Sequence, residues 1–214
     1  MSGNLAELEA QVRRELELTA HPTLDWMPNT SGPSGAHVYD VVIAGAGQGG
    51  LILAHHLMRD RVRNILLFDK AKFGQEGVWT TYARMPTLRS PKDYTGPDLG
   101  LASLTYQAWH EAKYGIADWD ALEFIPAGDW ADYLLWIRAV AEVPVRNEVE
   151  LTGIAAAPDD LLKVTLKTTT GEEQVYARKL VLATGQDGAG KWLAPPCIEH
   201  LPRQYWATTA DPID

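Results

Sequence analysis

Short apolar runs and amphipathic stretches alternate over the first 70 residues, and their order predicts a βαβ unit. Residues 41–44 form an apolar, mostly β-branched run, which is typical of a strand buried on both faces. Residues 51–58 carry apolar side chains at helical spacing, and Ile65–Phe68 is a second apolar run that predicts a neighbouring strand. Ahead of this unit, Leu5–Leu18 alternates leucine and valine with glutamate and arginine, as an amphipathic helix does.

Two further helices are predicted in the middle of the chain. Residues 105–114 and 129–140 have helical apolar spacing, and Asp129 is a candidate N-cap of the second helix. Before these helices, residues 70–100 lack any sustained periodicity and are rich in glycine, proline, threonine, arginine and lysine. A loop of this length inside a compact domain is usually either functional or disordered.

A run of strands follows the helices. Residues 145–155, 161–168 and 173–177 are strand-like and are separated by the turn-forming segments Pro-Asp-Asp and Thr-Thr-Gly. Residues 179–183 predict one more buried strand, which leads into a glycine turn. The whole pattern predicts an α/β fold, a Rossmann-like domain with a parallel sheet, an N-terminal βαβ unit and a three-stranded antiparallel β-meander.

Three regions are expected along the chain. Residues 1–36 would form an N-terminal helix and arm, and residues 37–190 would form the Rossmann-like domain. Residues 191–214 contain several prolines and are expected to form an irregular C-terminal arm.

A glycine fingerprint stands where the first strand meets the helix. Gly45, Gly47 and Gly50 have G-x-G-x-x-G spacing, and Asp69 ends the second strand 24 residues after Gly45. In this motif the glycines permit a tight turn, a close approach of a pyrophosphate to the backbone, and close packing of helix on strand. The helix N-terminus attracts phosphate, and the acid is placed to accept hydrogen bonds from an adenosine ribose. We therefore predict a dinucleotide site. Because Gly45, Gly47 and Gly49 also fit a G-x-G-x-G loop, an S-adenosylmethionine-dependent methyltransferase stays open as an alternative.

Composition and charge narrow the range of partners. The net charge of −9 and the lack of a basic stripe argue against a nucleic-acid partner. No apolar run approaches 18 residues, so no membrane partner is expected. Cys197 is the only cysteine, which excludes an intrachain disulfide and favours a cytoplasmic location. No cluster of histidine, cysteine and acidic residues has metal-ligand spacing, so no metal is expected.

The order of elements resembles the FAD-binding half of flavin-dependent monooxygenases, which include flavin-containing, Baeyer–Villiger and N-hydroxylating enzymes. The glycine fingerprint, Asp69, Gly77-Val78-Trp79 and the Ala-Thr-Gly turn at 183–185 carry this resemblance. Residues 88–100 are also similar to a segment of bacterial FAD/NAD(P)-binding proteins. The resemblance spans residues 38–214.

The resemblance implies a set of contacts with FAD. The glycine loop at 45–50 would cradle the pyrophosphate. Asp69 and Lys70 would meet the adenosine ribose, and the segment with Gln75 and Trp79 would lie along the ribityl chain and the isoalloxazine ring. The backbone of Val149 would meet the adenine, and the Ala-Thr-Gly turn would close over the cofactor. The predicted cofactor-binding residues are Gly45, Ala46, Gly47, Gln48, Gly49, Gly50, Asp69, Lys70, Gln75, Trp79, Val149, Thr184 and Gly185. Of the loop cations, Arg89 is the candidate for a catalytic, electrostatic role near the flavin or a nicotinamide.

The function that the resemblance implies is an FAD-dependent oxidoreductase of the monooxygenase type, with NADPH as a possible hydride donor and an unidentified small-molecule substrate. Such enzymes use a second G-x-G-x-x-G unit for NADPH, and this sequence shows one such unit. We therefore expect a fragment, a half completed by a partner chain or a homo-oligomer, or a protein with another use for the flavin. A non-catalytic nucleotide-binding remnant is the alternative interpretation, and the methyltransferase is a further one.

Overall fold

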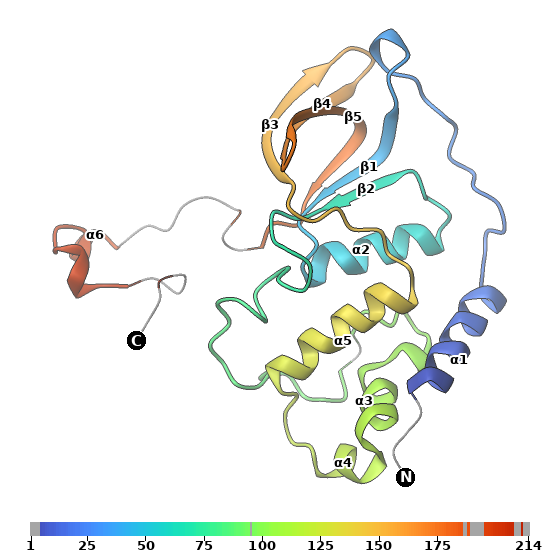
Figure 1. The fold of residues 1–214 in the computed structure, drawn as a ribbon, viewed down its shortest axis with the longest axis vertical. Coiled ribbons are helices and arrows are strands. Elements are labelled where there is room, and N and C mark those ends of the chain that lie inside the picture. Colours follow the sequence, from blue (N-terminus) through green and yellow to red (C-terminus); the bar gives the residue numbers. More distant parts are fainter. Residues whose placement is uncertain (1–4, 95, 186–187, 189–194, 208–210, 212–214) are drawn as a thin grey trace.

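The computed structural model describes residues 5–94, 96–185, 188, 195–207 and 211. These residues fold around one five-stranded mixed sheet. Its strands are β1 (Val38–Ala44), β2 (Ile65–Phe68), β3 (Glu150–Ala157), β4 (Leu161–Thr168) and β5 (Gly171–Leu182), in the order β2-β1-β5-β4-β3. β1 runs parallel to both β2 and β5, whereas β3, β4 and β5 form an antiparallel meander. The predicted α/β, Rossmann-like class is confirmed, with its βαβ unit and its three-stranded meander (Figure 1).

Strand β5 belongs to both halves of this sheet. Its first part pairs with β4, from Gly171 to Ala177, and its last part pairs with β1 up to Leu182. The prediction of two separate strands at 173–177 and 179–183 is therefore wrong, because one strand continues through Arg178. The expected burial of the second strand is also wrong, since Leu182 is 58% exposed. The start of β3 at Glu150 likewise corrects the predicted strand start at residue 145.

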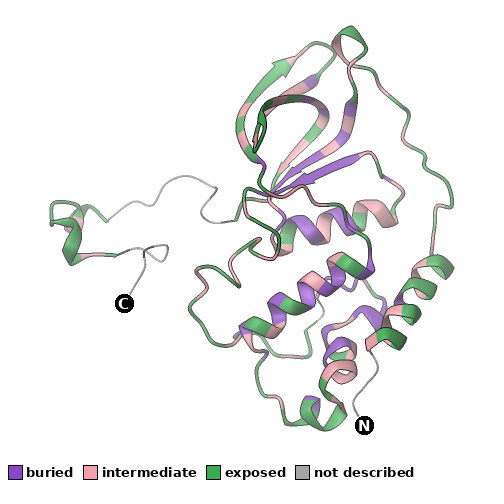
Figure 2. Ribbon diagram, viewed as in Figure 1, coloured by how far each residue is buried: buried purple, intermediate pink, exposed green. Residues whose placement is uncertain are grey.

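The helices lie in layers beside the parallel end of the sheet. α2 (Gln48–Arg59) connects β1 to β2 and packs against both, and α5 (Ala127–Val140) lies next to it (Figure 1). Beyond α5 lie α3 (Tyr106–Tyr114) and α4 (Ile116–Ala121), with the 3-10 turn Ala102–Leu104 before them. Figure 2 shows burial concentrated in β1, β2 and the facing sides of α2 and α5. The core thus sits between the parallel strands and the helical layers.

Two details of the helical layer differ from the sequence-based expectation. The N-cap of α5 is Pro126, and the predicted cap Asp129 instead lies in the first turn, where its Oδ1 accepts a hydrogen bond from the Tyr114 hydroxyl (2.8 Å). Trp109 is 2% exposed, although mostly polar residues stand next to it in the sequence. It packs against Tyr106 and Tyr133, which belong to α3 and α5.

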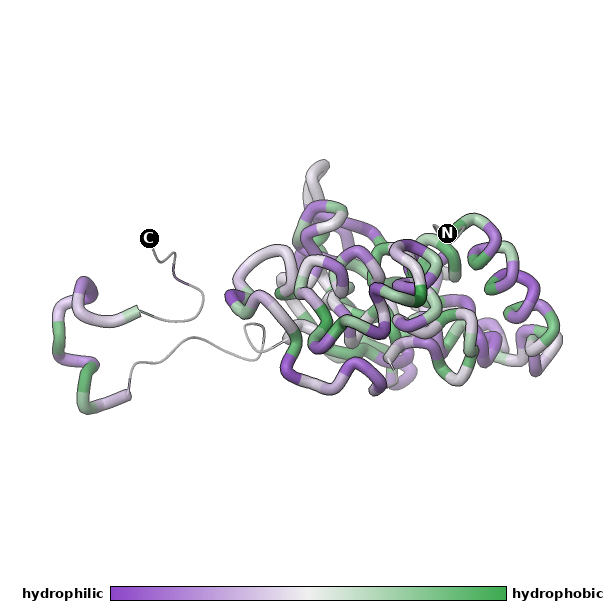
Figure 3. The backbone as a smooth tube through the Cα atoms, turned by 90° about the horizontal axis from the view of Figure 1, so that it is seen from below, coloured by the Kyte–Doolittle hydropathy of each residue, from purple (hydrophilic) through white to green (hydrophobic). Residues whose placement is uncertain are grey.

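Helix α1 (Leu5–Leu18) is where the sequence places it, and it packs against the helical layer through Val12, which is fully buried. Figure 3 shows hydrophobic and hydrophilic residues alternating along its turns near the N-terminus. An arm containing the 3-10 turn Pro33–Gly35 then leads to β1. At the other end lie α6 (Pro196–Glu199) and the 3-10 turn η4 (Arg203–Tyr205), where the sequence predicted an irregular arm. Residues 191–194, 208–210 and 212–214 of that arm lie outside the described residues. In the described part, no helix has the length and apolar character needed to cross a bilayer.

A buried histidine makes this core sensitive to acid. His55 on α2 is 2% exposed, and burial together with the nearby charge of Arg59 lowers the pKa of its imidazole from 6.5 to about 4. The carbonyl of Pro97 acts weakly in the opposite direction, and His56 adds a small lowering. Glu17, Arg13 and Glu142 line the same cavity as His55 from α1 and from the end of α5. Because the unfolded chain takes up a proton between pH 6.5 and 4 that the folded chain does not, stability falls as the pH falls through this window.

Replacing His55 with leucine is expected to remove this part of the acid sensitivity. Between pH 7 and pH 4.5 the wild type should lose about 2 kcal/mol of unfolding free energy that the His55→Leu variant keeps. Urea unfolding at the two pH values measures the difference. The exposed neighbour offers a matched control, because His56→Leu should lose as much stability in acid as the wild type. Equal losses in the wild type and His55→Leu would contradict the account.

Candidate functional site

The turn between β1 and α2 is so tight that three of its four glycines leave little or no room for a side chain. A Cβ on Gly50 would lie 1.9 Å from the Gly45 carbonyl oxygen, and a Cβ on Gly45 would lie 2.4 Å from the Ala183 carbonyl oxygen. Gly45 also has a φ of +103°, which disfavours any other residue. A Cβ on Gly47 would lie 3.1 Å from the Cα of Gly77, whereas a Cβ on Gly49 would have nothing within 4 Å. The required glycines are therefore those of G-x-G-x-x-G, and not those of G-x-G-x-G.

The N-terminus of α2 is left without a side-chain cap. Its N-cap is Gly47, which makes no side-chain hydrogen bond to the helix, and Gly49 in the first turn is exposed. The first N–H groups of a helix have no partner within the helix, and the helix dipole is positive there. An anionic group such as a pyrophosphate fits this open edge, because the backbone N–H groups can bind it without a side chain in the way.

Asp69 is fixed directly beneath the glycine turn. Its Oδ2 accepts a hydrogen bond from the Ala46 N–H (2.7 Å), and its Oδ1 accepts one from the Ala71 N–H (2.8 Å). The N–H of Gly45 donates to the Phe68 carbonyl (2.8 Å), so the end of β2 and the turn are tied together. Since each carboxylate oxygen has a second lone pair, Asp69 keeps the capacity to accept from a ribose hydroxyl. That ribose contact stays a prediction.

A buried polar network, which the sequence analysis missed, holds the loop after β2 against the turn. Glu76 accepts hydrogen bonds from Arg138 Nη1 (2.6 Å) and Asn147 Nδ2 (2.6 Å), and its side chain is 7% exposed. Asn147 Nδ2 also donates to the Ala71 carbonyl (3.1 Å). The partners stand 62 and 71 residues from Glu76, so no local pattern reveals them. They fix the segment that brings Gly77 against Gly47.

Two aromatic residues flank the turn on the side of α5. Trp79 is partly buried and lines a small cavity of about 30 Å³ together with Gly47 and Gln48. The Oε1 of Gln48 accepts a hydrogen bond from the indole N–H of Trp130 (3.1 Å). A cavity of this size holds about one water molecule. A dinucleotide would therefore lie along the exposed edge of the turn and not inside this cavity.

The end of β5 completes the site. The N–H of Ala183 donates to the Ala44 carbonyl (2.8 Å), which places the predicted residues Thr184 and Gly185 next to Gly45. Both residues are exposed, and Gly185 has a φ of +67°. The structure thus brings the glycine turn, the acid after β2 and the Ala-Thr-Gly turn to one edge of the parallel sheet. Ligands of α/β folds bind at this carboxyl edge.

The remaining predicted residues are less closely tied to the turn. Lys70 and Gln75 are exposed on the loop after β2. Val149 is buried, and its N–H is occupied by the Asp69 carbonyl (2.9 Å), so only its carbonyl could meet an adenine. Arg89 is exposed, directly after Leu88, whose N–H donates to the Ile125 carbonyl (2.8 Å). Its catalytic role stays a prediction.

Two further cations of the loop at 70–100, Arg84 and Lys92, have structural partners. Lys92 donates to the Trp119 carbonyl (2.6 Å) and lies over the Trp119 ring, and Arg84 donates to the Asp211 carbonyl. Among the residues that the structure describes, no three acidic, histidine or cysteine side chains are arranged to hold a metal ion.

Comparison with known proteins identifies a family and a relative. A family model described as FAD-NAD(P)-binding matches residues 42–187. An FAD-dependent urate hydroxylase from Xanthomonas campestris pv. campestris is 47% identical over 212 residues, which is 99% of this chain and 44% of that protein. This chain thus spans less than half the length of that relative.

Solved structures share the fold. An ornithine N-hydroxylase from Kutzneria sp. 744, solved with reduced FAD, NADP+ and L-ornithine, superposes with a TM-score of 0.56 at 19% identity, covering 68% of this chain and 37% of that one. A cadaverine monooxygenase from Erwinia amylovora bound to FAD superposes with a TM-score of 0.53 at 17% identity, covering 76% of this chain and 38% of that one. At these identities the likeness concerns the fold alone.

Proposed function

The chain belongs to the FAD-NAD(P)-binding family, and on that premise we propose that it is the FAD-binding part of a flavin-dependent hydroxylase. The observation that carries the proposal is the uncapped N-terminus of α2, where Gly45, Gly47 and Gly50 leave bare backbone beside Asp69. FAD bound there would supply the redox chemistry.

The family confirms the predicted resemblance and the predicted cofactor, FAD. The methyltransferase alternative is not favoured, because the family is one of dinucleotide-binding proteins. The surroundings of Gly49 also argue against a methyltransferase. The G-x-G-x-G interpretation requires glycine at this position, whereas the structure has room for a side chain there.

The chain's own residues would position the cofactor. The first N–H groups of α2 would bind the pyrophosphate. Asp69 would fix the glycine turn and accept hydrogen bonds from the adenosine ribose. The Glu76–Arg138–Asn147 network would keep the loop with Gly77 and Trp79 in place over the turn. A site whose supporting side chains are themselves fixed binds with less loss of entropy.

We extend the proposal to substrate and partners. The 47% identity to a urate hydroxylase across almost the whole chain supports urate, or a similar oxidised purine, as the substrate. The single glycine fingerprint of this sequence is assigned to FAD, so NADPH would bind at a second site. A partner chain, a homo-oligomer or a further domain of a longer polypeptide would supply that site.

The test bypasses the NADPH site: FAD bound to the chain is reduced with dithionite, freed of excess reductant and mixed with oxygen, with and without urate. The proposal predicts that urate is consumed in this single turnover and that no urate is consumed when FAD is omitted. FAD binding without any urate consumption by the reduced, FAD-loaded chain would contradict the hydroxylase and would favour a non-catalytic nucleotide-binding remnant.

A further inference from the structure

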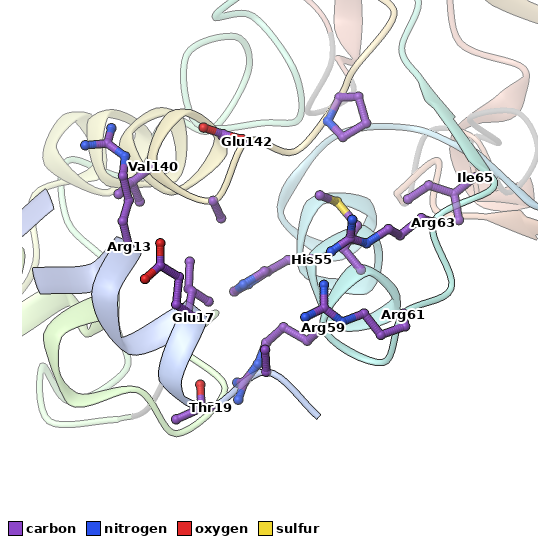
Figure 4. A pocket seen from close by; sticks show the side chains of 15 residues that line it. Arg13, Glu17, Thr19, His55, Arg59, Arg61, Arg63, Ile65, Val140 and Glu142 are labelled. Atoms are coloured by element: carbon purple, nitrogen blue, oxygen red, sulfur yellow. The ribbon is translucent and has the colours of Figure 1, made fainter. Parts of the chain in front are cut away.

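A second cavity lies at the other end of α2 from the glycine turn. Its volume is about 480 Å³, which is within the usual range for small-molecule sites. Figure 4 shows residues of α1 and the turn after it on one wall, with Arg13, Glu17 and Thr19, and residues from the end of α2 on the opposite wall. The end of α5 contributes Val140 and Ala141. No predicted FAD contact lines this cavity.

The charge of this cavity is opposite to that of the whole chain. Four arginines line it, at positions 13, 59, 61 and 63, against the two glutamates Glu17 and Glu142. The chain as a whole has 19 basic and 28 acidic residues. A concave, positively charged site on an acidic protein concentrates anions locally.

Two of these arginines are held in place without being neutralised. Arg59 Nη1 donates to the Leu99 carbonyl (2.7 Å), and Arg61 Nε donates to the Pro22 carbonyl (2.8 Å). Neither forms an ion pair with a carboxylate in the described part of the chain, whereas Arg13 lies 3.6 Å from Glu9 and Arg63 lies 3.5 Å from Asp25. A guanidinium has five N–H donors, so Arg59 and Arg61 each keep several for a ligand.

Besides the two arginines, a buried and poorly paired histidine, His55, indicates a ligand in this cavity. Its ring projects from α2 towards Glu17 in Figure 4, and it is 2% exposed. Neither ring nitrogen makes a well-formed hydrogen bond in the described part of the chain, and the Pro97 backbone acts on the ring only as a weak acceptor. A buried donor or acceptor without a partner is destabilising, so such groups are usually satisfied by water or a ligand. This imidazole faces the same space as the two held guanidinium groups.

The floor of the cavity is apolar. Ile65 and Val140 are buried, and Leu16 and Met58 are partly buried. A ligand that contacts both this floor and the arginines needs an anionic head group for the arginines and an apolar body for the floor. Inorganic phosphate lacks the second feature, and a neutral alkyl compound lacks the first.

We propose that this cavity binds a small organic anion, a carboxylate on an apolar body, at a site separate from the FAD turn. The carboxylate pairs with Arg59 and Arg61, the ring of His55 contacts the head group, and the alkyl or aryl body lies on Met58 and Val140.

Isothermal titration of the chain with hexanoate tests the proposal, with hexanamide as the neutral compound of the same shape. Hexanoate should bind with one site per chain, and hexanamide should bind at least about ten times more weakly. The variants Arg59→Gln and Arg61→Gln should each weaken hexanoate binding at least about ten-fold. The control Lys167→Gln, which removes one exposed positive charge on β4, should bind hexanoate like the wild type.

A second readout stands apart from the variants. The NMR signals of the His55 ring should move on addition of hexanoate to the wild type, and they should not move with hexanamide. Adding saturating hexanoate should leave FAD binding unchanged, so this result is separate from the proposed function. Equal binding of hexanoate and hexanamide, no binding of either, or displacement of FAD by hexanoate would each overturn the proposal.

Discussion

Gly50→Ala is expected to weaken FAD binding severely and to destabilise the fold by roughly 3 kcal/mol or more. The added methyl group would lie 1.9 Å from the Gly45 carbonyl oxygen, which is backbone and cannot move aside like a flexible side chain. Relief requires α2 to shift away from β1, and that shift carries away the N–H groups that would bind the pyrophosphate. FAD affinity should fall at least about 100-fold, which is about 2.7 kcal/mol.

The neighbouring glycine is the matched control. Gly49→Ala adds the same methyl group in the same helical turn, where nothing lies within 4 Å. It should weaken FAD binding far less than Gly50→Ala does, and it should stabilise the chain by a few tenths to about 1 kcal/mol, because alanine loses less backbone entropy than glycine in a helix. FAD titration and thermal unfolding of the two variants side by side give the comparison. If Gly49→Ala were the damaging change, the G-x-G-x-x-G assignment would be wrong.

Asp69→Ala is expected to have the second largest effect. It leaves the N–H groups of Ala46 and Ala71 without their acceptors at a position that is 9% exposed. Each unsatisfied donor costs about 1–3 kcal/mol, so the chain should lose about 2–4 kcal/mol of stability. FAD affinity should fall at least about ten-fold, because both the shape of the turn and the proposed ribose acceptor are lost.

Asp69→Asn separates charge from geometry. Both carboxylate oxygens accept from backbone N–H groups, so an amide must place its own NH2 against one of these donors. We expect Asn to recover only part of the stability and affinity that Ala loses. Glu172→Ala, which removes one exposed acid from β5, should behave like the wild type in both assays. Wild-type affinity in Asp69→Asn would show that the carboxylate has no part in the site.

The parts of the fold predicted from sequence are those whose pattern is local. Ile65–Phe68 and Leu161–Thr168 match the observed strands residue for residue, because an apolar run and an alternating run mark buried and half-buried strands. The glycine spacing likewise located the turn before its packing was known. In each case the residues that decide the structure are neighbours in the chain.

The misses depend on partners that are distant in the sequence. Arg178 interrupts the apolar pattern of β5, yet the strand continues because this side chain reaches Asp40 on β1 (3.2 Å between Nε and Oδ1). Trp109 is buried because Tyr133, on another helix, packs against it. The Glu76 network and the meeting of α1 with the end of α2 around the His55 cavity also form only in the folded chain. No local period carries this information.

Equilibrium titration of the chain with FAD, followed by the flavin absorbance, is the measurement that tests the central claim most directly. We expect one FAD per chain, displaced by ADP, which carries the same adenosine and pyrophosphate, and unaffected by FMN or S-adenosylmethionine. Failure of FAD to bind, or its displacement by S-adenosylmethionine and not by ADP, would contradict the claim that the first turn of α2 holds a dinucleotide beside Asp69.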